Sequence, residues 1–144
     1  MSIMFSRQCE YALQAVSYLA LQPEGELTSI KELTGRLNIP YHFLGKILQN
    51  LAQKEILLSQ KGRDGGFALA KHAKKITMYK IVEAIDGIDF TRQCVMGFAE
   101  CSSKHPCAVH TQWKKARTEL YELLSKKNIA EMALEMRRPE YQEQ

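Results

Sequence analysis

The sequence predicts a mainly α-helical fold with a small β-hairpin wing: a winged helix-turn-helix followed by a long C-terminal dimerisation helix. Three observations predict it. Two short helical patterns meet at a tight turn between residues 29 and 51, two strand candidates flank a basic, glycine-rich loop, and a polar helix with a narrow apolar seam lies near the C-terminus. A helix pair followed by a hairpin with a basic tip is typical of a winged helix.

Composition and charge limit the class of protein. The 144 residues, 45% of them hydrophobic, suffice for about one domain with one core. No apolar run approaches the ~20 residues that cross a bilayer and no signal-peptide pattern opens the chain, so we expect a cytoplasmic protein without membrane contact. Residues 1–75 carry ten Lys/Arg against six Asp/Glu, whereas residues 76–144 carry ten of each. The basic half is weak evidence for a polyanionic partner, and a solvated basic surface is the simpler interpretation of this fact alone.

The first two helices are predicted from apolar periodicity and end signals. The first covers residues 6–21, and Pro23 and Gly25 end it. Its apolar face consists of Tyr11, Ala12, Ala15, Val16, Leu19 and Ala20. The second opens at Ser29, and Glu32 three residues later has the spacing of a capping box. Its buried stripe consists of Ile30, Leu33 and Leu37.

A third helix follows the turn at residues 37–39. Pro40 is expected at its first position, where a missing N–H costs no hydrogen bond. Its core-facing residues are expected to be Phe43, Leu44, Ile47, Leu48 and Leu51. The pair reads as a helix-turn-helix, so Tyr41, His42 and Lys46 near the start of the third helix are expected to face the major groove of double-stranded DNA.

The wing is predicted from two short apolar runs, residues 56–59 and 67–70, on either side of a turn-rich loop. Lys61 and Arg63 in this loop are expected to contact phosphate or the minor groove, although a hairpin tip that is merely soluble would explain them as well. Further candidates for phosphate contacts are Arg7 and Lys31.

The C-terminal half contains a fourth helix, an irregular segment and a long helix. Thr77 is the expected N-cap of the fourth helix, which ends before Gly87, and residues 89–106 show no periodicity. The long helix is expected to begin near Cys107 or Ala108. Its seam, with spacings of 4, 3, 4 and 3, consists of Val109, Trp113, Ala116, Leu120 and Leu123. Such a seam packs on one partner helix. An internal partner is one alternative, whereas a second copy of the chain suits a protein that binds palindromic half-sites on DNA.

The expected organisation is a DNA-binding domain at 1–88, a cysteine-containing loop at 89–108, the dimerisation helix and a C-terminal helix at 109–136, and a frayed polar tail at 137–144.

Three of the four cysteines fall in one short window: Cys94, Cys101 and Cys107. Clustered cysteines in a chain without a secretory signal predict metal ligands or redox groups before disulfides. The spacings of six and five intervening residues are wide for a zinc knuckle, whereas a loop can wrap an iron–sulfur cluster. His110 is a candidate fourth ligand and ranks above His105, although a surface histidine is the alternative.

The sequence resembles the IscR/NsrR-type winged-helix regulators of bacteria (the Rrf-two family), small dimeric repressors and activators, from Phe5 to about Met132. The matching pieces are Glu10-Tyr11-Ala12-Leu13, residues 39–51, 62–69 and 77–87, the three cysteines, and the run Cys107-x2-His110-x2-Trp113. One departure is the gap between Cys94 and Cys101, which is one residue longer than in the closest IscR pattern. Gly45 is another, because a charged or polar residue is common there, so the operator preference does not transfer.

The resemblance implies an iron–sulfur cluster held by the three cysteines, with [2Fe-2S] slightly favoured over [4Fe-4S]. In the IscR branch the fourth ligand is a histidine that matches His110. In NsrR-like relatives it is a carboxylate of the other subunit, and the matching position is Glu10. Some relatives keep the fold without these cysteines, so the fold alone implies no cluster. The remaining cysteine, Cys9, is expected to be a small buried thiol.

We therefore expect a homodimeric transcriptional regulator whose operator binding depends on a cluster that senses redox state, nitric oxide, iron or cluster status. The first alternative is a cluster-free thiol switch that uses the same three cysteines. An electron-transfer or cluster-carrier protein is less favoured, because it needs no winged helix. An enzyme is not expected, because no nucleophile–base pair or phosphate-binding glycine loop occurs.

Overall fold

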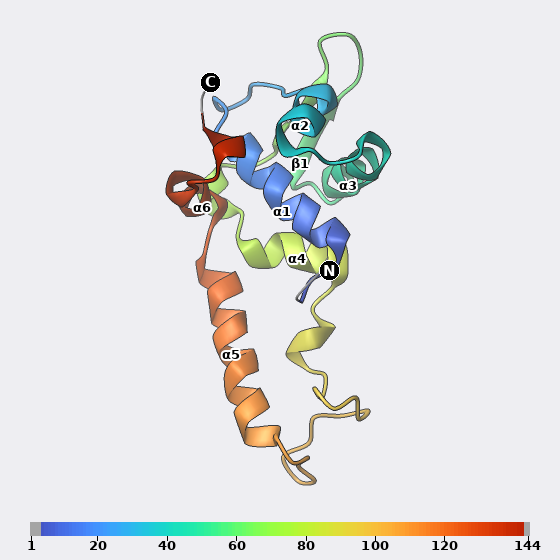
Figure 1. Ribbon diagram of the computed structural model, residues 1–144, viewed down its shortest axis with the longest axis vertical. Helices are drawn as coiled ribbons and strands as arrows, with labels where there is room; N and C mark the ends of the chain where they lie inside the picture. Colours follow the sequence, from blue (N-terminus) through green and yellow to red (C-terminus); the bar gives the residue numbers. More distant parts are fainter. Residues whose placement is uncertain (1–3, 143–144) are drawn as a thin grey trace.

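The computed structural model describes residues 4–142. Its elements follow in the order α1 (Arg7–Ala20), α2 (Ile30–Leu37), α3 (Tyr41–Gln53), β1 (Leu57–Gln60), β2 (Gly66–Leu69), α4 (Met78–Asp86), α5 (His110–Lys126) and α6 (Ile129–Glu135), with short 3-10 turns at Ala73–Lys75, Asp89–Thr91 and Pro139–Tyr141. A compact part holds α1 to α4, the hairpin and α6, and α5 projects from it beside the irregular segment after α4 (Figure 1). No helix in residues 4–142 has both the length and the apolar character that crossing a bilayer requires.

The main core surrounds α1, which packs against α3, α4 and α6. Ala12, Ala15 and Val16 on α1 are fully buried, and they meet Leu44 of α3 and Ile81 of α4 in one apolar cluster. Small residues on α1 allow the neighbouring helices to approach closely, so this helix is the central element of the compact part.

A second, smaller cluster attaches α5 to the compact part. Cys9 of α1, Val82 of α4 and Leu124 of α5 are fully buried together, and we call these three residues the α5 joint. The backbone N–H of Met78 donates to the carbonyl of Lys127 at 2.9 Å, which fixes the C-terminal end of α5 against the start of α4. The N-terminal end of α5 therefore lies at the far end of a projecting helix.

Local side chains cap the helices as predicted. The hydroxyls of Ser29 and Thr77 accept the backbone N–H groups of Glu32 and Lys80 and begin α2 and α4. The carboxylate of Glu32 accepts a hydrogen bond from Tyr18 at 3.2 Å and does not complete a capping box. Pro40 is the N-cap of α3 and not its first residue.

The hairpin forms the predicted wing with antiparallel register from Leu57–Leu69 to Gln60–Gly66. Thr28, just before α2, pairs with Phe67 through two backbone hydrogen bonds of 2.8 and 2.9 Å. A Cβ atom at Gly66 would overlap the carbonyl oxygen of Thr28. Glycine here lets the wing lie directly against the helix-turn-helix.

Three expectations about packing are wrong. The side chain of Phe43 is 46% exposed, because it lies on the flank of α3 and not on the face that holds Leu44. The helix α5 begins at His110, two residues after the later of its expected starts, Cys107 or Ala108. The predicted tail is not frayed over its described part: the hydroxyl of Tyr141 donates to the carbonyl of Gln14 at 2.8 Å. Positions 143–144 of that tail lie outside the described residues.

Candidate cysteine site and DNA-binding surface

The loop between α4 and α5 brings the predicted ligands together in two pairs. The Sγ atoms of Cys94 and Cys107 lie 3.9 Å apart, and the Sγ atom of Cys101 lies 3.4 Å from Nδ1 of His110. All four side chains line one cavity of about 230 Å³, together with His105. The pairing comes from the loop, which brings Cys94 back to the residues that precede α5.

Both pair distances match two donors on one tetrahedral metal. Bonds of about 2.3 Å to sulfur and about 2.0 Å to nitrogen place two sulfurs about 3.8 Å apart, and a sulfur and a nitrogen about 3.5 Å apart. No group of three or more His, Cys, Asp or Glu side chains within residues 4–142 converges on a single ion position. Each pair taken alone therefore has the spacing of two ligands on one metal atom.

The electrostatics of the two buried thiols differ. Backbone N–H groups at the turn after Cys94, that of Met96 foremost, lower the pKa of the Cys94 thiol below its ordinary value of 9.0. Burial raises the pKa of Cys9 to about 12, and Asp86 and Glu10 add to this effect. Cys9 is thus a small buried thiol, as predicted, while Cys94 lies where a thiolate is stabilised.

Glu10 lies in the first turn of α1, whereas the cysteine loop lies below the compact part, at the lower end of the molecule (Figure 1). Its carboxylate pairs with Arg7 at 3.4 Å. In the described residues Glu10 does not line the cavity that holds the three cysteines and His110.

The predicted dimerisation seam divides between two environments. Val109, Ala116 and Leu123 are exposed. Leu120 instead packs partly against the α5 joint, and the indole N–H of Trp113 donates to the carbonyl of Gln93 at 2.8 Å. Leu124, which the seam omitted, is the buried leucine of α5. The apolar side chains of Val95, Met96 and Phe98 in the cysteine loop are also exposed.

The exposed face of α3 carries the predicted base-reading residues. Tyr41, His42 and Lys46 are all exposed, and the His42 and Phe43 rings lie 4.6 Å apart. Gln49 is exposed one turn beyond Lys46, and helical spacing places it on the same face as His42. Gln49 was not among the predicted residues, although its spacing of seven from His42 marks it on the same face.

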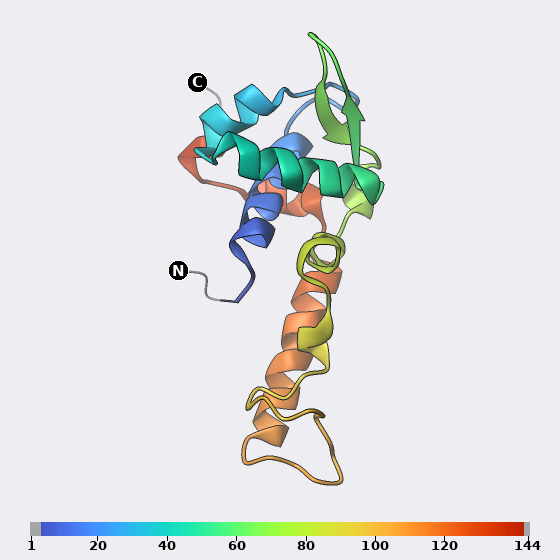
Figure 2. The same cartoon turned by 90° about the vertical axis from the view of Figure 1, so that its right-hand side faces the viewer.

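The predicted phosphate contacts have different surroundings. Lys61 and Arg63 are exposed between the two strands, and Lys31 is exposed in the first turn of α2. The guanidinium of Arg7 is engaged by Glu10 and lies 5.9 Å from the Tyr11 ring centre. The wing tip and the cysteine loop lie at opposite ends of the long axis (Figure 2).

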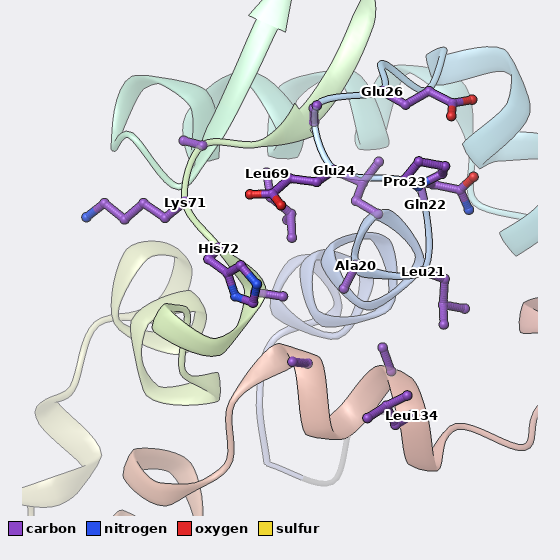
Figure 3. Close-up of a pocket in the computed structure, with 17 residues that line it drawn as sticks. Ala20, Leu21, Gln22, Pro23, Glu24, Glu26, Leu69, Lys71, His72 and Leu134 are labelled. Carbon is purple, nitrogen blue, oxygen red and sulfur yellow. The ribbon is translucent and has the colours of Figure 1, made fainter.

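A second cavity in the described residues contains none of the predicted site residues. It has a volume of about 540 Å³ and lies between the end of α1, the segment after β2, and α6. Alanines dominate its wall, and the side chains of Glu24 and His72 border it together with Leu69 and Leu134 (Figure 3).

Comparison with known proteins identifies the class. Residues 5–135 match the Rrf2 family, described as an iron-dependent transcriptional regulator. A candidate HTH-type transcriptional regulator of Aquifex aeolicus is 31% identical over 132 residues, covering 90% of this chain and 91% of its own. The NsrR regulator of Halalkalibacterium halodurans is 36% identical over 74 residues, 51% of each chain.

Solved structures share the fold. CymR, the global cysteine regulator of B. subtilis, superimposes with a TM-score of 0.80 at 22% identity, covering 94% of this chain and 99% of its own. The T. potens IscR superimposes with a TM-score of 0.73 at 20% identity, covering 96% and 95%.

The helix-turn-helix, the wing and these relatives define a winged-helix, DNA-binding transcriptional regulator and not an enzyme. The chain belongs to the Rrf2 family, which confirms the resemblance that its motifs indicated.

Proposed function

We propose that this regulator is a homodimer whose operator binding is controlled by an iron–sulfur cluster. The observation that carries the proposal is the pairing of donors at 3.9 and 3.4 Å around one cavity. The relatives NsrR and IscR and the family description support it as well.

The ligands would be Cys94, Cys101, Cys107 and His110. Two donor pairs support [2Fe-2S] over [4Fe-4S], because each of two irons then takes two protein ligands. A cluster supplies reversible one-electron chemistry and lability towards oxidants. The lowered pKa of Cys94 favours the thiolate that ligation requires. Glu10 of the partner subunit is the alternative fourth ligand.

The DNA contacts would come from the compact part of the molecule, mainly from α3 and the wing. Tyr41, His42 and Lys46 of α3 would read base edges in the major groove. Contacts to phosphate or the minor groove would come from Lys61, Arg63, Lys31 and Arg7. The exposed seam residues Val109, Ala116 and Leu123 would pack against a second copy and set the distance between the two half-sites.

The coupling between the two ends would pass through α5. The cysteine loop joins α4 to α5, and the α5 joint connects both helices to α1. A change in the loop would shift the N-terminal end of α5, and hence the subunits relative to each other, without disturbing the main core. This route explains how an event at one end alters DNA contacts at the other.

Native mass spectrometry of anaerobically purified protein, with a visible spectrum of the same sample, tests the cluster. We expect the mass of a dimer plus two [2Fe-2S] units. His110→Ala is expected to lower the cluster content, and His105→Ala, on the same cavity wall, is the matched control. If only Glu10→Ala removes iron, the fourth ligand is the partner's. A colourless dimer after reconstitution with iron and sulfide would contradict the proposal.

DNA binding is tested by mobility shift at fixed salt. Cluster-loaded and cluster-free dimers are expected to bind a genomic operator fragment with different affinity, and equal affinity would contradict control by the cluster. Absence of any specific shift would favour an electron carrier.

A thiol switch is a second candidate, because the Sγ atoms of Cys94 and Cys107 lie 3.9 Å apart, close enough for a small movement to join them in a disulfide. One solved structure of this fold, S. aureus CymR, is described as an oxidised form, with a TM-score of 0.75. This candidate predicts a colourless protein whose DNA affinity changes reversibly with oxidant and dithiothreitol.

A further inference from the structure

We propose that Trp113 is a positioning residue for the cysteine site. Its indole N–H donates to the backbone carbonyl of Gln93 at 2.8 Å, and through this bond it would hold Cys94 beside Cys107, whose Sγ atom lies 3.9 Å from that of Cys94. The relevance to a cluster rests on the proposed function, whereas the positioning of the thiol pair does not.

The position of this hydrogen bond in the chain allows a single bond to fix where the cysteine loop begins. Gln93 directly precedes Cys94, so the carbonyl that accepts the bond belongs to the peptide unit that leads into the first thiol. Trp113 lies on α5 three residues after His110, on the same helix face. The bond therefore ties the entrance of the cysteine loop to the helix at its exit.

Other hydrogen bonds of the loop are local. In the described part of the chain, the N–H groups of Gly97, His105 and His110 bond to residues three positions away. Such turns shape short segments but do not join the two sides of the loop. Besides the donor pairs themselves, the Trp113 bond is the one described hydrogen bond that does so.

Closing a flexible loop costs conformational entropy, and a fixed entrance reduces the part of that cost paid when the two thiols meet. An indole N–H is a donor only, so without the Gln93 carbonyl it would turn to water. Loss of one such bond is expected to lower the population of the close Cys94–Cys107 arrangement roughly five-fold, equivalent to about 1 kcal/mol.

The thiol pair gives a readout that needs no cluster. Metal-free, reduced protein is treated with diamide, which accepts two electrons and two protons as the thiols of Cys94 and Cys107 form one disulfide. The rate is followed by quenching with iodoacetamide and measuring the cross-linked peptides by mass spectrometry. One thiolate first adds to a diamide nitrogen, and the second thiol then attacks that sulfur, forms the disulfide and displaces the hydrazine. Only the second step needs the close arrangement, so its rate is measured at a diamide concentration at which the first step is fast.

Two substitutions isolate the N–H group. Trp113→Phe removes it with part of the ring, and 3-benzothienylalanine at position 113 keeps the bicyclic shape but replaces N–H by sulfur. Both are expected to slow disulfide formation roughly five-fold. Tyr121→Phe is the matched control, because Tyr121 is an aromatic residue of α5 that packs on Tyr79 and not on the loop. Rates equal to wild type in both Trp113 variants would overturn the proposal, and so would an equal slowing in Tyr121→Phe.

A second arm uses the loaded protein. The half-life of the visible cluster spectrum in excess chelator is expected to shorten by a similar factor in both Trp113 variants. If no variant, nor the wild type, takes up a cluster, the proposed function fails and the disulfide rates still decide the role of Trp113. If wild type and both Trp113 variants form clusters, lose them at the same rate and form the disulfide at the same rate, the positioning role is wrong and the proposed function still stands.

Discussion

The compact DNA-reading part and the projecting cysteine end of this protein are stabilised in different ways. The compact part encloses a continuous apolar core around α1, including Ala12, Val16 and Leu44. Along α5 only Leu124 is buried, and the loop before it exposes Val95, Met96 and Phe98. The first part has the contacts of a finished domain, whereas the second presents thiols, an imidazole and apolar side chains suited to further partners.

The largest expected effect that tests this contrast comes from replacing each of two adjacent leucines on α5. Leu124→Ala would empty the α5 joint and is expected to lower the free energy of unfolding by about 3 kcal/mol, as for other fully buried leucines. Leu123 is 53% exposed, so Leu123→Ala is expected to change the free energy of unfolding of the monomer by less than about 1 kcal/mol. Urea unfolding followed by circular dichroism, at several protein concentrations, measures both.

The same pair separates folding from association. Leu123→Ala is expected to weaken the dimer in sedimentation experiments, because this side chain belongs to the exposed seam. If Leu123→Ala destabilises the monomer as much as Leu124→Ala does, the two parts are not built differently at all.

Local signals explain why the compact part could be predicted from sequence. The caps at Ser29 and Thr77 and the stop at Gly87 act through residues within a few positions, so their effects are readable along the chain. Phe43 was misjudged because it lies at the border of the apolar face of α3, and the tail at Tyr141 was misjudged because its order depends on a distant element. Tyr141, for instance, meets α1 across 127 positions of sequence.

The cysteine end was predictable in composition but not in geometry. The spacing of the cysteines identified the ligands, whereas the pairing of Cys94 with Cys107 depends on how the loop folds back. A heptad seam contains several apolar positions, and periodicity alone does not tell which of Leu120, Leu123 and Leu124 faces the chain's own core. The inward bond of Trp113 was hidden for the same reason.

Glycines in the compact part provide the next test. Gly66→Ala would press a methyl group against the Thr28 carbonyl and is expected to cost about 1–3 kcal/mol of unfolding free energy. Gly35→Ala in α2 meets open space and is expected to gain about 0.5–1 kcal/mol, because alanine favours a helix. Thermal unfolding ranks the two, and a neutral Gly66→Ala would show that the wing does not need its close contact with Thr28.

The pKa values of the two buried thiols, Cys9 and Cys94, are shifted in opposite directions. Cys9 has its pKa raised to about 12 from 9.0 by burial, so its contribution to stability is complete below pH 9 and is lost as pH rises towards 12. Relative to Cys9→Ala, the free energy of unfolding of the wild type is expected to fall by up to about 1.4 kcal/mol per pH unit over this range. Urea titrations of both proteins at pH 8 to 11 test this, and parallel curves would place Cys9 outside the core.

The pKa of the Cys94 thiol is shifted in the opposite direction, below its ordinary value. Its lowered pKa keeps thiolate present below pH 9, so iodoacetamide is expected to label Cys94 in folded, metal-free protein at pH 7.5 well before Cys9. Peptide mapping over time measures the order. Labelling of Cys9 first would contradict the environments of both thiols.

Exposed charges at the two ends give the smallest effects and the most direct link to function. Arg63→Ala and Lys61→Ala at the wing tip are each expected to reduce the slope of log affinity against log salt by about 1, because each releases about one counterion on contact with phosphate. Lys114→Ala is the matched control, since Lys114 is equally exposed but lies on α5 near the cysteine end. Fluorescence anisotropy with an operator duplex across a salt series measures the slopes. If Lys114→Ala lowers the slope as much as the wing variants do, DNA contacts extend along α5, and the division of the molecule into a reading end and a sensing end is incorrect.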